Sequence, residues 1–267
     1  MPFPFFLRTA YVGTAFHGWQ IQTSLRSVQA ELWRALQALD PEAPMPQGTG
    51  RTDAGVHARA QGVLIRTARA WEPYRLLAAL NAHLPADVRV LHVQPVPEAF
   101  WPRHHAVAKR YVYRIGEGAA EDPFWRDRRW HVHGATPLDR EAMAQAASFL
   151  PGTHDFSSFR HQECAARTPV RTIHRVAVTG AWPAMDLVFE GNRFLMHQVR
   201  IMAGTLVEVG KGRRRAEDLQ EILAARDRRR AGHTAPAHGL YLEEVWYQAR
   251  WSIGSPSPWG EPDEEPF

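Results

Sequence analysis

The sequence predicts an α+β protein in which strands and helices alternate in both halves of the chain. Runs rich in β-branched and aromatic residues, which are typical of strands, occur in each half. Between them lie segments whose apolar residues recur at helical spacing. The 267 residues, 45% hydrophobic and 22% charged, suit a globular chain of one large or two modest domains. We therefore expect two units of similar composition, without a readable sequence repeat.

Residues 1–103 are expected to form the first unit. A strand that leads into a turn is followed by a helix, a glycine-rich loop, a strand, a second helix and a third strand. A proline ends each of the two helices. The segments are FFLRTAYVGTAFHGWQ (5–20), SVQAELWRALQALD (27–40), GTGRTDAGVHA (48–58), QGVLIRT (61–67), YRLLAALNAHLP (74–85) and VRVLHVQPV (88–96).

Residues 104–247 are expected to form the second unit, and the proline-flanked stretch PEAFWPRHH marks the boundary. The helix over 136–152 should have Thr136 as its cap, with Pro137 in the first turn and Asp139 at the capping-box position. The other expected elements are a strand at 108–116, a strand pair at 170–180 and 184–191, helices at 191–212 and 215–229, and a strand at 239–247.

The last residues, 248–267, differ in composition from the rest. They are rich in proline and contain one arginine and four acidic residues. Such a segment cannot bury enough apolar surface to fold, so we expect a disordered tail.

The compartment follows from what the sequence lacks. No apolar run reaches the ~18 residues that a membrane span needs. The first residues, MPFPFFLRTAYVG, lack the basic region and cleavage site of a signal peptide. Cys164 is the single cysteine, which makes an internal disulfide impossible. A cytoplasmic protein with no membrane partner is the simplest expectation.

The charge pattern allows a nucleic-acid partner. The formal net charge is +4, and only two of the 32 basic residues are lysines. Arginine suits phosphate binding and stacking on bases, although a general compositional preference for arginine explains the pattern equally well. Two arginine runs, Arg213–Arg215 and Arg228–Arg230, could contact an anionic partner or form an ordinary solvated surface.

The glycine-rich loop fits neither common nucleotide-binding pattern. A dinucleotide fingerprint needs a third glycine where this chain has Asp53, and a carboxylate there would repel a pyrophosphate. A phosphate loop needs Lys-Ser or Lys-Thr after Gly55, where the chain has Val56-His57. Asp53 therefore remains as a candidate for chemistry, and its alternative role is that of a common turn residue beside glycine.

Histidine and serine clusters offer weaker signals. His104-His105, His131-x-His133 and His161-x-x-Cys164 show no repeated ligand spacing, so ordinary packing or surface histidines explain them and no metal is expected. His131 and His133 should share one face of a strand. The stretch HDFSSF has no nucleophile elbow around its serines.

The predicted helix at 191–212 contains an unusual arginine. Apolar residues surround this helix on nearly every side, which indicates burial, yet Arg200 lies in its middle. A buried arginine is costly unless a carboxylate or an anionic ligand binds it; alternatively its charged end reaches solvent. Gly204, one turn later, leaves room beside it. On the strand at 108–116, Tyr111 shares a face with Lys109 and Tyr113, an arrangement suited to base stacking or to plain strand packing.

These features occur together in one family. The chain resembles the tRNA pseudouridine synthase A (TruA) family over nearly its whole length up to about Tyr247. Gln198 replaces a more usual methionine, ARAQ follows the loop motif where a glycine often precedes Gln, and the acidic tail has no counterpart. The matching segments are YVGTAFHGWQ (11–20), GTGRTDAGVHA (48–58), KRYVY (109–113), FLMHQVRIMAGTLVEVG (194–210) and APAHGLYL (235–242).

The resemblance implies an isomerase that converts uridine to pseudouridine at positions 38, 39 and 40 of the tRNA anticodon stem-loop, without cofactor or metal. It implies Asp53 as the nucleophile, with Tyr111, Arg51 and Arg200 at the substrate. It also implies two similar subdomains, each an antiparallel sheet with helices on one face, around a central cleft in a homodimer. Two other classes fit the sequence less well. The presence of Asp53, Tyr111 and Arg200 argues against a catalytically silent RNA-binding module of the same shape. The absence of metal-ligand spacing argues against a hydrolase or nuclease that uses His/Asp clusters.

Overall fold

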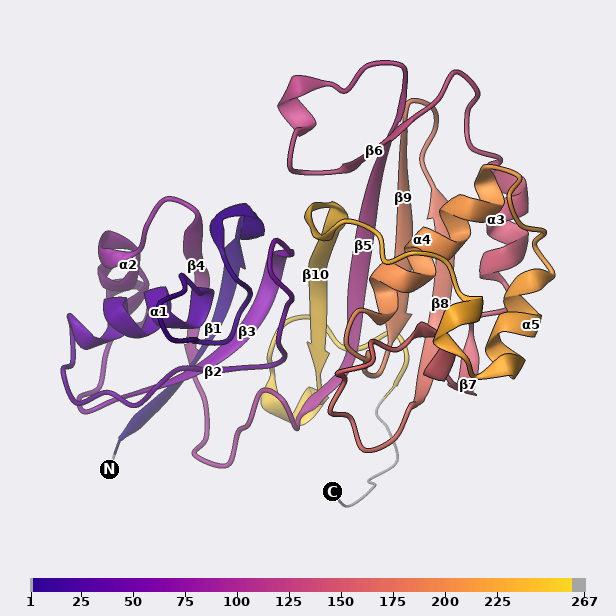
Figure 1. Ribbon diagram of the computed structural model, residues 1–267. Coiled ribbons are helices and arrows are strands. Elements are labelled where there is room, and N and C mark those ends of the chain that lie inside the picture. The colour runs from indigo at the N-terminus through magenta and orange to yellow at the C-terminus, as the bar shows by residue number, and fades with distance from the viewer. Residues whose placement is uncertain (1, 261–267) are drawn as a thin grey trace. The chain divides into compact units, whose positions relative to one another are not determined.

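The computed structural model describes residues 2–260 and is a mixed α+β protein, as predicted (Figure 1). The chain divides into two compact units. The first comprises Met1–Ala108 with Leu242–Phe267, and the second comprises Lys109–Tyr241. This division differs from the expected boundaries chiefly because most of the last strand belongs to the first unit.

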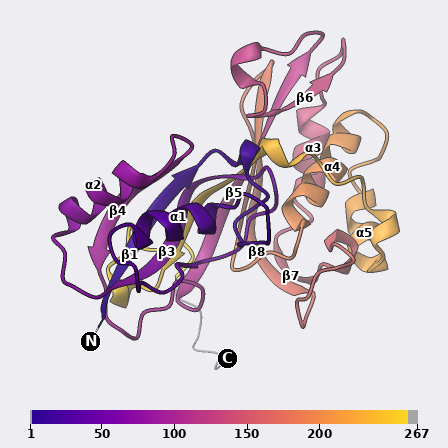
Figure 2. The same cartoon turned by 60° about the vertical axis from the view of Figure 1, so that its left-hand side comes forward.

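The first unit is an antiparallel sheet with two helices. The strand order is β4-β1-β3-β10, and β2 pairs with one end of β3. Figures 1 and 2 show both helices on the same side of the sheet. The elements are β1 (Phe3–Tyr11), α1 (Val28–Gln37), β2 (Gln47–Gly48), β3 (His57–Thr67), α2 (Pro73–His83), β4 (Val88–Pro95) and β10 (Leu240–Tyr247).

Sequence patterns account for most of this unit. Val28, Leu32 and Leu36 recur at a spacing of four and are buried, which places α1 on the sheet. The Ser27 hydroxyl accepts a hydrogen bond from Ala30 N and caps this helix. At the other end of the unit, Tyr247 packs edge to face on Phe6, which explains why the end of β10 lies with the first unit.

In the second unit, the strands of the sheet lie in the order β5-β9-β8-β7. The pairs β5–β9, β9–β8 and β8–β7 are antiparallel, whereas the short β6 pairs with β5 in parallel. The three helices gather on one side of this sheet in Figure 1. The elements are β5 (Ala106–Gly118), β6 (Trp130–His133), α3 (Arg140–Ala147), β7 (Gly152–Asp155), β8 (Val170–Thr179), β9 (Ala184–Gly191), α4 (Gln198–Gly210) and α5 (Asp218–Ala225).

Two helix starts differ from the predictions. The α3 helix begins at Arg140, because the Asp139 carboxylate accepts a hydrogen bond from Ala142 N and is itself the cap in place of Thr136. The α4 helix begins at Gln198 instead of 191, since His197 has a left-handed backbone with φ 61°. The prediction began too early because the apolar residues before His197 also recur at helical spacing, although the chain forms a turn there.

The expected disorder of the tail does not hold for its first residues. Ala249–Trp251 form a short 3-10 helix, and the Trp251 ring lies 4.5 Å from that of His105. Ile253 is buried as well. Residues 261–267, the most acidic part of the predicted tail, lie outside the described residues.

Candidate active site

Asp53 lies on the loop between β2 and β3 of the first unit and is half-buried. The peptide oxygen of Asp53 accepts a hydrogen bond from Val56 N at 3.2 Å, which closes a tight turn. Gly55, within that turn, has φ +78°, a conformation that favours glycine. The loop glycine thus shapes the turn that carries the carboxylate.

The loop is held on both sides of Asp53 by the segment that follows β1. Before Asp53, the Thr52 hydroxyl is 2.8 Å from the buried Tyr11 hydroxyl, and Thr52 O accepts from Trp19 N at 3.1 Å. After Asp53, Gly55 N donates to Phe16 O at 3.1 Å. The two sequence motifs at 11–20 and 48–58 are therefore two sides of one structure, and several hydrogen bonds hold the residues on either side of Asp53.

Gly13 brings the two segments together most closely. A Cβ atom at this position would lie 2.0 Å from Val56 O, a distance at which no side chain fits. Gly13 N donates to His57 Nδ1 at 3.0 Å, so the buried His57 ring accepts at Nδ1 and carries its proton on Nε2. A close backbone approach and a buried histidine thus fix the end of the loop.

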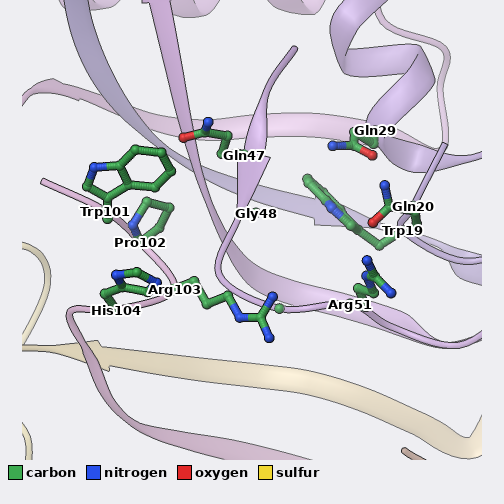
Figure 3. Close-up of a pocket in the computed structure, with 11 residues that line it drawn as sticks. Trp19, Gln20, Gln29, Gln47, Gly48, Arg51, Trp101, Pro102, Arg103 and His104 are labelled. Carbon is green, nitrogen blue, oxygen red and sulfur yellow. The ribbon is translucent and has the colours of Figure 1, made fainter. Parts of the chain in front are cut away.

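Arg51, two residues before Asp53, is exposed and lines a cavity of about 300 Å³ (Figure 3). Gly50 lines the same cavity, and its carbonyl accepts a hydrogen bond from Gln61 Nε2 at 2.7 Å. The Thr49 side chain hydrogen-bonds to Gly62 O and to the Tyr247 hydroxyl. The loop before Asp53 is thereby tied to β3 and β10, while the Arg51 guanidinium faces solvent.

In the second unit, α4 confirms the predicted burial. Eleven of its thirteen residues are buried, and Arg200 is one of the two that are not. The Arg200 side chain is nevertheless anchored, because Nε donates to Ala235 O at 2.8 Å. In return, Ala235 N donates to Arg200 O at 3.1 Å. The guanidinium is therefore aligned by a backbone contact before any substrate arrives.

The segment that holds Arg200 lies directly along α4. The Thr205 hydroxyl donates to Ile201 O at 2.8 Å and accepts from Gly232 N at 2.9 Å. Gly204 permits this approach, since a Cβ atom there would lie 2.0 Å from His233 O. The space predicted beside Arg200 is thus filled by this chain's own backbone.

Two tyrosines of β5 lie in the same unit. Tyr111 is 9% exposed and makes an edge-to-face contact with Phe194 at 5.1 Å. Tyr113 is fully buried, and its hydroxyl donates to Pro236 O at 2.7 Å. Burial raises the pKa of the Tyr113 phenol well above its ordinary value, and the charge of Arg200 offsets only part of that rise. Tyr113 therefore stays protonated and supports the segment that positions Arg200.

The four predicted site residues fall into two groups. Asp53 and Arg51 lie on one loop of the first unit, and Tyr111 and Arg200 lie on β5 and α4 of the second. The sequence reasoning missed the supporting residues Tyr11 and Thr52. Their only signal was the aromatic character of the first strand, which plain packing also explains.

The other sequence candidates have structural roles. His131 and His133 do share a face of β6, with ring centroids 4.4 Å apart. Nowhere in residues 2–260 do three His, Cys, Asp or Glu side chains gather to hold a metal ion. Within the arginine runs, three guanidinium groups bind carboxylates, as expected of a solvated surface: Arg214 to Glu208, Arg215 to Asp218, and Arg229 to Asp227. None of the described helices has the length and apolar character needed to span a bilayer.

Several known proteins are similar to this chain over most of its length. A family model described as tRNA pseudouridine synthase matches residues 146–248. The tRNA pseudouridine synthase A of Myxococcus xanthus is 45% identical over 243 residues, which cover 91% of each chain. That of Azorhizobium caulinodans is 45% identical over 90% of this chain and 93% of its own. That of Halalkalibacterium halodurans is 45% identical over 88% of this chain and 89% of its own.

These matches define the class of protein as a pseudouridine synthase, an isomerase. Within that class, the chain belongs to the tRNA pseudouridine synthase A family.

Proposed function

We propose that the protein isomerises uridine to pseudouridine at positions 38, 39 and 40 of the tRNA anticodon stem-loop, with Asp53 as the nucleophile. The observation that carries this proposal is the way the loop is held. Trp19 N donates to Thr52 O, Phe16 O accepts from Gly55 N, and the Tyr11 and Thr52 hydroxyls are hydrogen-bonded, so the residues on both sides of the half-buried Asp53 are held. A plain turn aspartate needs no such support, whereas a nucleophile must be held in a productive position.

The reaction breaks the bond between uracil N1 and ribose C1′, turns the base and forms a bond from C5 to C1′. N1 gains a proton and C5 loses one, so no atom is gained or lost overall and no cofactor is required. Asp53 acts as the carboxylate anion, and we assign Arg200 to the binding of the substrate.

The geometry of each unit supports these roles. The guanidinium of Arg200 is aligned through its Nε contact with Ala235 O, so little ordering is needed when substrate binds. Tyr111 offers an aromatic surface against the target base and assists the later loss of the C5 proton. Arg51 is exposed, as suits binding of an RNA phosphate or of the displaced nucleotide.

The target base must leave its stack before it reaches Asp53, at a cost of a few kcal/mol. Phosphate contacts from arginine and stacking on aromatic side chains offset that cost. The resemblance to the family further supports a cytoplasmic protein that acts as a homodimer. Sedimentation of the purified protein would test the homodimer.

One experiment tests the function directly. Pseudouridine would be mapped in bulk tRNA from cells lacking the gene, before and after incubation with the purified protein. The proposal predicts new pseudouridine at positions 38–40 and nowhere else. Unmodified tRNA together with tight, salt-dependent binding would instead support the silent RNA-binding module, and modification outside these positions would refute the site assignment.

A further inference from the structure

Apart from Arg51, the side chains that line the Arg51 cavity have no role in the proposed isomerisation. Eleven residues line it, all in the first unit, and Asp53 is not among them. The walls come from β2 and the Asp53 loop, from the segment after β1, from the first turn of α1 and from the stretch that follows β4. Figure 3 shows Trp19 and Gln20 on one side of Gly48, and Trp101 with Pro102 on the other. At about 300 Å³, the cavity suits one small planar ligand.

The charge of the lining selects the kind of ligand. Arg51 and Arg103 both line the cavity and both are exposed, whereas none of the eleven lining residues is a carboxylate. Two indoles, those of Trp19 and Trp101, line the same cavity. Guanidinium groups beside indoles match a ligand that combines a phosphate with an aromatic base.

The buried part of the lining offers one polar group to the edge of a base. Gln47 Oε1 is buried and lacks a donor within the described chain. A buried polar group without a partner carries a free-energy cost that a bound ligand can remove. One acceptor is thus available in the cavity.

The Trp101 indole is exposed yet held in place. It is 41% exposed, although its backbone N–H donates to His105 Nδ1 at 3.0 Å. The Arg66 guanidinium lies over the ring with Cζ 5.6 Å from the centroid, and the His104 ring lies nearly parallel to it, at 26°. An exposed aromatic ring whose orientation is already set loses little entropy when a base stacks on it.

We infer that this cavity binds the base and phosphate of the nucleotide next to the uridine that reacts, in RNA substrates of the proposed function. Arg51 and Asp53 are two residues apart, so their Cα atoms are separated by at most about 7 Å. A ligand bound at Arg51 is therefore a neighbour of the ligand at Asp53. The base stacks on Trp101 and donates a hydrogen bond to Gln47 Oε1, while Arg103 and Arg51 bind the phosphate.

The test is a binding cycle that removes both sides of the predicted stack. Dissociation constants are measured with the Asp53→Asn protein, which leaves the target uridine unchanged during the measurement. They are measured again with the double variant that also carries Trp101→Ala. The ligands are an intact anticodon stem-loop and two versions that lack the base just before or just after the target uridine. Trp101→Ala should weaken binding of intact RNA about 10-fold, which is about 1.4 kcal/mol.

One of the two abasic RNAs should bind the Asp53→Asn protein about 10-fold more weakly than intact RNA does. Adding Trp101→Ala should not weaken the binding of that RNA further. Arg103→Ala should weaken binding of every RNA and lower the slope of log Kd against log salt by about 1. Trp182→Ala, on an exposed tryptophan of the β8–β9 turn, and Arg75→Ala, on the exposed side of α2, are matched controls that should change neither quantity. Equal melting temperatures establish that all variants are folded.

Two outcomes separate this inference from the function on which it rests. If Trp101→Ala weakens binding of intact and abasic RNAs equally, or of none, the cavity does not hold a neighbouring base and the inference fails. Wild-type protein is assayed in parallel for pseudouridine on intact tRNA. If it forms none, the proposed function fails, whatever the binding cycle shows.

Discussion

Gly13→Ala tests whether the close approach of two backbone segments positions Asp53. The new Cβ would lie 2.0 Å from Val56 O and 2.4 Å from Val56 C, where ordinary contacts begin at 3.4 Å. Both obstructing atoms belong to the backbone, so no side chain can turn aside. The segment from Gly55 to Val56 must then move by about 1.4 Å, within three residues of Asp53.

A misplacement of about 1 Å costs roughly 10²-fold in rate. We therefore expect Gly13→Ala to lower kcat about 100-fold, or about 2.7 kcal/mol in the barrier, while overpacking lowers stability by about 1–3 kcal/mol. Single-turnover pseudouridine formation at saturating tRNA measures the first effect, and urea unfolding measures the second.

Gly134→Ala is the matched control. Its Cβ would meet only Thr136 O, at 3.6 Å, which is an ordinary contact. This variant should retain normal kcat and stability. A folded Gly13→Ala protein with kcat within about threefold of wild type would refute the reasoning, because the loop would then tolerate the shift.

Three further predictions concern the supporting contacts. Tyr11→Phe removes the hydroxyl that bonds to Thr52 and should lower the free energy of unfolding by about 1–3 kcal/mol in urea titrations; an unchanged midpoint would contradict it. Arg200→Ala should lower kcat at least about 10²-fold, and Arg200→Lys should not restore it because lysine lacks the Nε–H that bonds to Ala235 O; full recovery in the lysine variant would show that charge alone suffices. Burial tends to raise the pKa of Glu208, but hydrogen bonds from Arg214 and His233 outweigh it and lower the pKa. Its stabilisation is therefore present above pH ~4.3 and is lost as pH falls through the lowered folded pKa, so wild type should lose more stability than Glu208→Gln between about pH 5 and 3; parallel losses would contradict this.

Most helices and strands could be predicted from the sequence because the apolar residues that define each one recur at short spacing within that element. In α1, Val28, Leu32 and Leu36 alone indicate the buried face. The start of α4 could not be predicted in the same way. Leu195 continues the apolar stripe into the turn, and the left-handed backbone of His197 has no sequence signature of its own.

The candidate site shows the same limit more sharply. Asp53 became a candidate because its loop fits neither nucleotide-binding pattern and has a carboxylate where the dinucleotide pattern needs a glycine, and Arg200 because a charge interrupts an apolar helix. The contacts that hold the site join residues distant in the chain, such as Tyr11 to Thr52 and Arg200 to Ala235. No periodicity reports such contacts. Trp101 went unnoticed for a related reason, since its proline-flanked segment resembles a boundary between units.

The role of Asp53 is tested most directly by one comparison. Wild-type and Asp53→Asn proteins would be incubated with tRNA carrying tritium at C5 of uridine, and the tritium released as the C5 proton is lost would be measured. The carboxamide nearly preserves the shape of the side chain but cannot act as an anionic nucleophile, so the variant should bind tRNA normally and release no tritium above background. Release by Asp53→Asn at a rate near that of wild type would contradict the assignment.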